Sequence, residues 1–420
     1  NGGTATFKGG TIQNLGNSVL INNKAGTTNI EGINLAAKNV AIQNGNSDNT
    51  TAILNINSGT ISSEENLAIS NYATVNHSDG TVSSSATDSI TVANRATGSY
   101  TLNGGMITSK TNVFSNLGTF EMTSGTMTTD GNYPTYYNNG GTATFQGGTI
   151  QNPGNKTPIY NKAGTTNIDG INLTNKGTTV QNGDSDNTTA ILNINSGTIS
   201  SLENLAISNY ATVKHSDGTV SSSSTSKATA INAAAGSYTL SGGSITSSTG
   251  NAFINQGTFM MKSGTITTDG NVPTYVNNGG TTTFKGGNIL NTGGAILTYN
   301  VSGTVNMDSM SLTNTGSVLI NGKTAADTNV MNLNNCSISS TESTTIGNNG
   351  ILTITNGSVT SNAGNAINNA RKVTLKGNAK ITSSIKNYPT IYNKSGATLT
   401  KDSTVTVTNT GGGTAIYNAS

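Results

Sequence analysis

The sequence predicts an all-β fold: a single continuous three-sided parallel β-helix (β-solenoid) of about 18 coils, held by an asparagine ladder. Three observations predict it. An asparagine recurs at intervals of about 22 residues, apolar and polar residues alternate inside each interval, and only 32% of the 420 residues are hydrophobic and 9% charged. A period of this length is typical of stacked coils that bury their apolar faces against one another.

The recurring asparagine occupies one position in each coil. The predicted ladder residues are Asn22, Asn44, Asn71, Asn94, Asn116, Asn138, Asn161, Asn182, Asn209, Asn232, Asn255, Asn277, Asn300, Asn321, Asn348, Asn369, Asn393 and Asn418. Stacked at strand spacing, about 4.8 Å apart, their amides can hydrogen-bond along the column and satisfy groups that burial would leave unpaired. Asparagine also tolerates positive φ at a tight turn. A disordered chain of similar composition lacks such a period, so the pattern predicts order.

Each coil is predicted to hold three short strands. In the first strand, apolar residues at alternate positions face inward, as at Leu54 and Ile56. In the second, one inward aliphatic residue stands between two polar ones, as in Thr60–Ser62, and the third places an apolar residue such as Ile69 two before the ladder asparagine. Glycines before the second strand are expected to adopt positive φ, and they are Gly10, Gly59, Gly80, Gly105, Gly125, Gly148 and Gly264.

With three strands per coil, asparagine at one tight turn and glycine at another, the chain resembles the bacterial right-handed parallel β-helix family. This is the pectate-lyase-like β-solenoid of surface adhesins and autotransporter passengers. The resemblance covers the whole chain and lies in its architecture. It implies a right-handed winding and a role outside the cell, although the same fold also carries polysaccharide lyases and hydrolases.

A longer repeat divides the chain into three modules of six coils. Residues 1–7 recur as 139–145 and, with changes, as 278–284, and the match is closest between 49–79 and 187–217. The predicted modules are 1–138, 139–277 and 278–420, joined into one continuous rod without linkers. Duplication of a whole module lengthens a stalk or multiplies a binding surface. Because the sequence opens and stops at ladder turns, we expect it to be a segment of a longer protein whose export signal and anchor lie outside it.

Composition argues against several classes of partner and site. The net charge of +2 is small and scattered, and arginine occurs only at Arg95 and Arg371, so no basic stripe for nucleic acid is predicted. A lone cysteine, Cys336, excludes a disulfide framework and a cysteine-based zinc site, and it occupies the slot of a small turn residue such as Gly59. No stretch approaches the roughly 18 apolar residues of a membrane span. We predict no cofactor and no metal site.

Two features invite a chemical interpretation. The third coil of each module has 27 residues, and the excess follows the ladder asparagine at 45–51, 183–189 and 322–328. Aspartate and asparagine in these loops are oxygen donors that calcium could use, but both are also common turn formers, so a solvated loop is the preferred interpretation. His77 and His215 recur at equivalent inward positions, which favours a neutral core histidine over a catalytic one.

The most regular outward feature is a column of hydroxyl-bearing residues on the second strands. Its candidate binding residues are Thr60, Ser62, Thr81, Ser83, Thr126, Thr128, Thr198, Ser200, Thr219, Ser221, Thr265 and Thr267. The pattern continues at Ser358, Thr360, Thr404 and Thr406 and is interrupted at Gln13, Met106, Gln151, Leu290 and Lys380. Threonine has a high strand propensity and keeps an outer face soluble. The same face could contact a glycan, a protein or, as flat threonine arrays on other solenoids do, ice.

A polysaccharide-degrading site would need paired carboxylates, or calcium with a basic residue, on one outward face across adjacent coils. Glu64, Glu65 and Glu203 follow second strands, but no arginine or lysine is expected beside them, and Glu121 stands between threonines of the neighbouring coils. We therefore predict no catalytic residues. The fold alone does not establish an activity.

These observations together predict a non-catalytic, extracellular β-solenoid segment of a bacterial surface adhesin, either at the cell surface or secreted. It is expected to serve as a stalk and as a repetitive binding surface for host or bacterial cell-surface glycans and proteins. Three alternatives remain at this point. They are a filament subunit that associates end to end through its open strand edges, an ice-binding protein and a polysaccharide-degrading enzyme.

Overall fold

The computed structural model describes residues 2–420, and the regular structure of these residues is entirely β. Asn1, the predicted first residue of the first module, lies outside the described residues. The chain divides into two compact units: residues up to Leu202 together with Ala206–Lys214, and Glu203–Leu205 together with His215–Ser420. Each is a parallel β-solenoid, with about 18 coils in all, which confirms the predicted fold class. The division into three modules stays a prediction.

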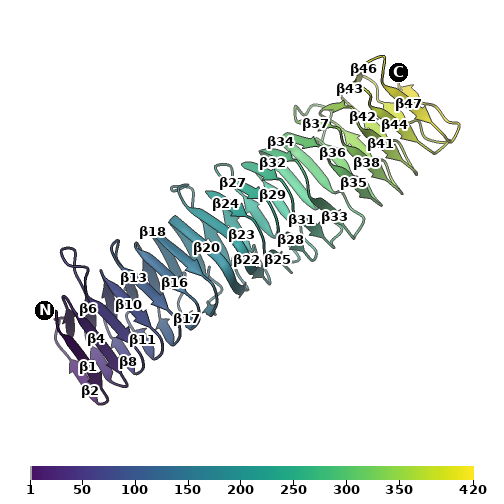
Figure 1. Ribbon diagram of the computed structural model, residues 1–420. Helices are drawn as coiled ribbons and strands as arrows, with labels where there is room; N and C mark the ends of the chain where they lie inside the picture. Colours follow the sequence, from purple (N-terminus) through teal and green to yellow (C-terminus); the bar gives the residue numbers. More distant parts are fainter. Residues whose placement is uncertain (1) are drawn as a thin grey trace. The chain divides into compact units, whose positions relative to one another are not determined.

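In the first unit every coil contributes a first, a second and a third strand, and like strands stack in parallel register (Figure 1). The first strands are β1 (Thr4–Lys8), β4 (Thr27–Glu31), β7 (Ile53–Ile56), β10 (Thr74–His77), β13 (Ser99–Leu102) and β16 (Thr119–Met122). The second strands form a seven-stranded sheet of β2 (Thr11–Asn14), β5 (Asn34–Ala37), β8 (Thr60–Ser63), β11 (Thr81–Ser84), β14 (Met106–Ser109), β17 (Thr126–Thr129) and β19 (Thr149–Gln151). The third strands are β3 (Ile21–Asn23), β6 (Ile42–Asn44), β9 (Ile69–Asn71), β12 (Val92–Asn94), β15 (Phe114–Asn116), β21 (Val180–Asn182) and β23 (Ile207–Asn209). Longer strands run through the corners as β18 (Tyr136–Phe145), β20 (Ile159–Asn175) and β22 (Ile191–Ser201), and β24 (Thr212–His215) lies where the first unit ends in the sequence.

The second unit repeats this plan. Its first strands are β27 (Ser237–Leu240), β30 (Thr258–Met261), β37 (Val330–Asn334), β40 (Ile351–Thr355), β43 (Lys372–Lys376) and β46 (Thr398–Lys401). Its second strands are β25 (Thr219–Ser222), β28 (Ser244–Ser247), β31 (Thr265–Thr268), β33 (Asn288–Asn291), β35 (Ser311–Asn314), β38 (Ser337–Ser340), β41 (Ser358–Ser361), β44 (Lys380–Ser383) and β47 (Thr406–Asn409). Its third strands are β26 (Ala230–Asn232), β29 (Phe253–Asn255), β36 (Leu319–Asn321), β39 (Ile346–Asn348), β42 (Ile367–Asn369), β45 (Ile391–Asn393) and β48 (Ile416–Asn418), while β32 (Tyr275–Phe284) and β34 (Thr298–Asp308) each combine a third strand with the next first strand.

The core is built from the alternation that the sequence predicts. Leu54 and Ile56 of β7 are completely buried, and Leu54 is in register with Val75 of β10, which is in register with Tyr100 of β13. Because register fixes which face each side chain takes, the apolar positions of every coil meet those of the coils on either side. Burying one such aliphatic side chain stabilises the fold by about 1.5–3 kcal/mol. The core therefore runs along each unit as a stack of apolar layers.

The asparagine ladder forms as predicted except at its two ends. Asn71 donates from Nδ2 to Oδ1 of Asn94 at 2.8 Å, and the same pattern links Asn94 to Asn116. The first member is Asn23, whose Nδ2 donates to Oδ1 of Asn44 at 2.8 Å, whereas Asn22 is exposed. The prediction of Asn22 is therefore wrong, because side chains alternate along β3 and only Asn23 points inward.

The ladder residues lie on strands, not at positive-φ turns. They end the short third strands or, at Asn138, Asn161, Asn277 and Asn300, lie within the longer strands that continue through the corner. The only non-glycine residues with positive φ among residues 2–420 are Asn155, Ser309, Asn335 and Asn356. At the other end of the ladder, Asn418 is in register with Asn393 but its side chain is exposed. The predicted turn glycines do take positive φ, with values from 69° at Gly105 to 95° at Gly59.

Two aromatic clusters fill equivalent parts of the core. In the first unit, Phe114 packs on Phe120 with ring centroids 4.5 Å apart, and it stacks on Tyr136 at 5.6 Å. In the second unit Phe253 and Phe259 repeat the first contact at 4.6 Å. The complete clusters are Tyr100, Phe114, Phe120, Tyr136 and Phe145, and Tyr238, Phe253, Phe259, Tyr275 and Phe284, all at most 1% exposed.

Candidate functional site

The candidate surface is the outer face of the second strands, where the predicted hydroxyl column lies. In the first unit, Thr60, Thr81, Met106 and Thr126 occupy one row of register partners on β8, β11, β14 and β17. A parallel row runs through Ser62, Ser83, Thr108 and Thr128. The inward residue between the rows, such as Val82, is completely buried, so the hydroxyl side chains are directed outward. The structure thus brings six of the predicted binding residues together on one sheet.

The remaining predicted residues take the same positions on other strands. Thr198 and Ser200 lie on β22 of the first unit. In the second unit Thr219 and Ser221 lie on β25, and Thr265 and Thr267 lie on β31, with β28 between these strands. All six are partly exposed.

The interruptions of the column are also where the sequence places them. Met106 and Lys380 take threonine positions in the first row, and Gln13, Gln151 and Leu290 take positions in the second. One predicted pair is wrong. The column on β47 consists of Thr406 and Thr408, because these are the register partners of Lys380 and Thr382, and Thr404 lies in the preceding turn.

The hydroxyl groups of the column differ in whether they already hydrogen-bond to other protein atoms. Thr60 Oγ1 donates to Asn34 Oδ1 at 2.8 Å, and Ser62 Oγ donates to the Leu35 carbonyl at 3.1 Å. The hydroxyls of Thr81, Ser83 and Thr128 make no hydrogen bond within residues 2–420. They are therefore free to donate to, and accept from, a ligand on this face.

A shallow hollow of about 370 Å³ lies on this face of the first unit. Ser62, Ser83 and Thr108 line it from the column, and Glu64 and Lys110 line it from the adjoining corner. The hollow thus offers hydroxyl groups together with two carboxylates, Glu64 and Asp130, and the ammonium group of Lys110. Such a lining suits a polar ligand and offers no aromatic platform.

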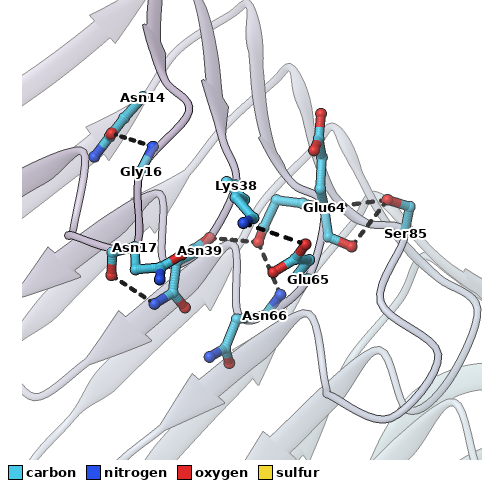
Figure 2. Close-up of polar contacts among 10 residues, drawn as sticks. Asn14, Gly16, Asn17, Lys38, Asn39, Glu64, Glu65, Asn66 and Ser85 are labelled. Atoms are coloured by element: carbon cyan, nitrogen blue, oxygen red, sulfur yellow. Dashed lines mark hydrogen bonds and ion pairs between the residues drawn. The ribbon is translucent and has the colours of Figure 1, made fainter.

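The corner beside the hollow carries the glutamates that the sequence singled out (Figure 2). Lys38 Nζ lies 3.8 Å from Glu65 Oε1, so the expectation that no lysine accompanies these glutamates is wrong. Ser85 Oγ donates to the backbone carbonyl of Glu64 at 3.2 Å. Because Glu65 is 64% exposed, this ion pair contributes little to stability. Its effect is to neutralise the Glu65 carboxylate, one of the two adjacent glutamates.

Both histidines lie in the core, as the sequence predicts. His77 is completely buried, its Nδ1 lies 2.9 Å from the Tyr100 hydroxyl, and its Nε2 lies 3.4 Å from the Gly80 carbonyl. A carbonyl can only accept, so Nε2 carries the proton and Nδ1 accepts from the tyrosine. Burial lowers the pKa of His77 to about 4. His215 repeats these contacts with Tyr238 and Gly218, and burial also lowers its pKa to about 4.

The 27-residue coils close their extra loops with internal hydrogen bonds. Asn46 Oδ1 accepts from the backbone nitrogens of Asp48 and Asn49 at 2.9 and 2.8 Å. Asp184 Oδ1 does the same for Asp186 and Asn187 at 2.9 and 2.7 Å. These oxygens serve the turn. Among residues 2–420, no three His, Cys, Asp or Glu side chains are grouped as a metal site would need.

The third loop uses different residues for the same closure. Asp327 Oδ2 accepts from the backbone nitrogens of Lys323 and Thr324 at 2.6 and 3.0 Å. These backbone donors hold the pKa of the Asp327 carboxyl below its usual value.

Cys336 sits at the turn slot that the sequence assigns to it. It is 3% exposed and stacks beside Gly357, and burial raises the pKa of its thiol. The positive φ of this turn falls on the preceding Asn335, at 52°, which is why a residue with a side chain is tolerated here. The thiol is therefore a small core group.

Sequence reasoning missed a second set of hydroxyls, which are buried at the corner before the third strand. Thr91 Oγ1 donates to the Thr108 carbonyl, and Thr135 Oγ1 to the Gln151 carbonyl, both at 2.8 Å. The set is Thr91, Thr135, Thr179, Thr229, Thr274, Thr345 and Thr390. The signal was present, because each of these threonines stands three residues before a ladder asparagine.

Comparisons of this chain with protein-family models, with curated proteins and with solved structures gave no match. Residues 2–420 contain no helix with the length and apolar character needed to cross a membrane.

Proposed function

We propose that this chain is a non-catalytic segment of a bacterial surface adhesin, outside the cell, that combines a stalk with a repeated binding face. The observation that carries the proposal is the outward hydroxyl column on the second strands. It recurs in both units, on strands whose opposite face is fixed by the apolar core. A ligand therefore meets a surface that is held rigidly and presented many times, which raises avidity without requiring a strong single site.

The free hydroxyls and the hollow support a glycan or a polar protein surface as the ligand. Ser83 and Thr108 line the hollow, and the Ser83 hydroxyl has no hydrogen-bond partner in the described chain. Paired donor and acceptor groups on a rigid face are what recognition of sugar hydroxyls requires. The likeness of the fold to adhesins and autotransporter passengers points in the same direction.

The test is a solid-phase screen of the full chain against host glycans, matrix proteins and bacterial cells. The variant Ser83→Glu/Ser221→Glu places a carboxylate on the hydroxyl face of each unit at equivalent positions. We expect it to lose the contacts that the unmodified chain makes. The matched control, Thr101→Glu/Thr239→Glu, alters outward positions of first strands and should bind normally.

Two results would overturn the proposal. One is silence of the unmodified chain across the whole panel. The other is equal loss in both variants, since that would show a response to added charge and not to this face.

A further inference from the structure

The charge of the chain is segregated, contrary to the expectation that it is scattered. Residues 349–420 contain seven of the twenty lysines and arginines but only one acidic residue, Asp402, which gives this stretch a net charge of +6. The rest of the chain has a net charge of −4. The small total of +2 therefore hides a strongly basic segment of the second unit.

The equivalent coils of the other predicted modules show that this is not a general property of the repeat. Residues 72–138 have two basic and four acidic residues, a net charge of −2, and residues 210–277 have three basic and two acidic residues, a net charge of +1. The coils share their architecture and ladder. The basic character of 349–420 is therefore an addition to the repeat, and not a requirement of the fold.

Most of the cations gather around one face. The seven are Arg371, Lys372, Lys376, Lys380, Lys386, Lys394 and Lys401, and all six lysines are exposed. Lys372 and Lys376 stand at the two ends of β43 and point outward, because Val373 and Leu375 between them are completely buried. We call the outer surface of β40, β43 and β46 the basic face.

The start of β43 has further cations beside it, from the adjoining residue and from the next coil. At the start, Arg371 precedes Lys372, and the backbone nitrogen of Lys394 in the next coil donates to the Asn369 carbonyl at 2.9 Å. At the end, Lys376 faces outward, whereas Lys401 on β46 is the register partner of the buried Leu375 and therefore takes an inward-facing position. A five-residue strand separates the cations at its two ends by roughly 13–16 Å.

Hydroxyl groups fill the space between the cations at the two ends of β43. Thr353, Thr374 and Thr400 are register partners on β40, β43 and β46 and lie on the outward side of the face. They form a row across three adjacent coils, about 4.8 Å apart. The basic face therefore has a central hydroxyl row with ammonium groups along both edges.

The lysines of this segment are not committed to acidic partners in the protein. The two ion pairs of residues 2–420 involve Lys8 and Lys38, both in the first unit. Asp402, the single acidic residue of the segment, accepts from the Gly377 backbone nitrogen at 3.0 Å. Arg371 interacts electrostatically with Asp327, and the six remaining lysines outnumber Asp402, so they repel one another and attract an anionic polymer.

We propose that the basic face binds an acidic polysaccharide, one that bears carboxylate or sulfate groups along its chain. The lysines along both edges would pair with the anionic groups, and the threonine row would hydrogen-bond the sugar hydroxyls between them. The inference names a ligand class for the adhesin proposed above and rests on that proposal for its biological setting. The geometry itself does not depend on it.

Nucleic acid is the competing polyanion, and the face fits it less well. The outward positions of β40, β43 and β46 carry no aromatic side chain on which a base could stack. The row of Thr353, Thr374 and Thr400 offers hydrogen bonds that suit the many hydroxyl groups of a sugar chain more than the phosphates of a nucleic acid. A polysaccharide with spaced charges and many hydroxyls matches both features.

The experiment measures binding of the full chain to immobilised polygalacturonate, dextran sulfate and neutral dextran, with a 20-nucleotide single-stranded DNA as competitor. We expect binding to at least one acidic polymer, none to neutral dextran, and weakening as salt is raised. The carboxylate and sulfate polymers separate the two sources of negative charge.

Matched variants locate the site. Lys372→Gln/Lys376→Gln/Lys394→Gln should weaken binding about tenfold or more, because it removes charges from both ends of β43. Lys214→Gln/Lys227→Gln/Lys262→Gln removes the same number of charges from the equivalent coils of another module and should leave affinity unchanged. Thr374→Val tests the hydroxyl row without altering charge. Circular dichroism and thermal melting of each variant verify that it is folded.

Equal weakening by both lysine variants, or tighter binding of the DNA than of either acidic polymer, would overturn the inference. So would a failure of the chain to bind both polymers at low salt. If cell adhesion by the full chain persists in any of these cases, the proposed adhesin function stands and only this ligand class is lost.

Discussion

At the scale of single residues, the buried histidines couple stability to pH. The pKa of His77 and of His215 falls from 6.5 to about 4 on folding, because burial disfavours the charged imidazole. A group whose folded pKa is depressed binds protons more readily in the unfolded chain, so its stabilising effect is complete above pH 6.5 and is lost as pH falls toward 4.

We therefore predict that the free energy of unfolding decreases by about 3 kcal/mol per histidine between pH 6.5 and pH 4. Chemical denaturation at several pH values measures it. The variant His77→Leu/Tyr100→Phe removes the imidazole and the hydroxyl that it pairs with, and its pH dependence should be reduced by half of the histidine contribution. An unchanged pH slope in this variant would show that carboxylates cause the effect.

One buried hydroxyl offers a test of the tyrosine contacts. Tyr275 OH lies 2.6 Å from Thr282 Oγ1, whereas the equivalent Tyr136 OH is buried and interacts with the Asn116 side chain without a hydrogen bond of normal geometry among residues 2–420. The position that corresponds to Thr282 is Ala143. The first unit therefore lacks a contact that the second possesses.

We predict that Ala143→Thr stabilises the first unit by about 1 kcal/mol, because it satisfies a buried hydroxyl. Thr282→Ala should destabilise the second unit by a similar or larger amount, since it leaves Tyr275 OH unpaired. Hydrogen exchange of the surrounding strands measures both effects. Destabilisation by Ala143→Thr would mean that the core around Phe120 has no room for the added atoms.

The contribution of the asparagine ladder to stability can be tested by comparing a ladder residue with Asn22, which was wrongly predicted to belong to the ladder. Replacing Asn94 by alanine removes the donor to Asn116 and the acceptor of Asn71, both buried, and should cost about 2–3 kcal/mol. Asn22→Ala, at the exposed neighbour of Asn23, should change stability by less than about 0.5 kcal/mol. Equal costs would show that the stacked amides do not hold the coils. Local hydrogen exchange is the appropriate measurement.

At the scale of the structural element, the turn before the second strand has two separable costs. Gly59 has φ of 95°, and an added Cβ would lie 2.3 Å from the Ile33 carbonyl of the neighbouring coil. Gly10 occupies the same turn with φ of 77°, but an added Cβ would meet nothing within 4 Å. The two glycines therefore distinguish backbone strain from close approach.

We predict that Gly10→Ala costs about 1 kcal/mol, from positive φ alone. Gly59→Ala should cost about 3 kcal/mol or more, because the coil beneath must also move. Equilibrium unfolding compares them. If both cost the same, the stacking of coils adapts to an extra methyl group and close approach does not explain the glycine.

The elements themselves were largely predictable from the sequence, for a physical reason. A parallel stack places every coil in the same environment, so the alternation seen at Leu54 and Ile56 recurs in each coil. An ambiguous assignment in one coil can therefore be checked against the equivalent residues of the others. Where the pattern is locally ambiguous, prediction failed. At Ile21–Asn23 two asparagines adjoin, and the apolar residue two positions earlier is Leu20 for one and Ile21 for the other.

The longer repeat would have resolved this ambiguity, because the offset of 138 residues between the first two modules maps Asn161 onto Asn23. The outward orientation of the hydroxyl column follows from the same alternation, and its role in binding stays a prediction. The Lys38 and Glu65 pair was not found, because their proximity depends on how a corner folds across two coils. The corner segments do not follow the repeat pattern of the strands, so contacts made there are the hardest to predict from the sequence.

At the scale of the whole molecule, the aromatic clusters predict uneven protection. Residues 100–145 and 238–284 enclose large aromatic side chains that pack on one another, while residues 349–399 are filled by aliphatic side chains. Because a repeat protein can open locally, stability is a property of neighbouring coils more than of the chain.

We predict that backbone amides in the two aromatic segments exchange at least about tenfold more slowly than those of 349–399 under native conditions. Hydrogen exchange with mass spectrometry measures all three segments in one experiment. Uniform exchange would indicate that the chain opens cooperatively and that local packing does not set protection. Phe120→Leu should lower protection in the first aromatic segment and leave the second unchanged.

The closure of the 27-residue coils has a consequence for how such a chain can change over time. Asn44 bonds Asn71 at 2.9 Å across 27 residues, and Asn71 bonds Asn94 at 2.8 Å across 23, so the amide contact is indifferent to the length of chain between its partners. The corner after Asn44 absorbs the difference. Insertions there are hidden from the stack, and a surface under pressure from antibodies or phage could acquire new epitopes at this corner while its scaffold is inherited intact.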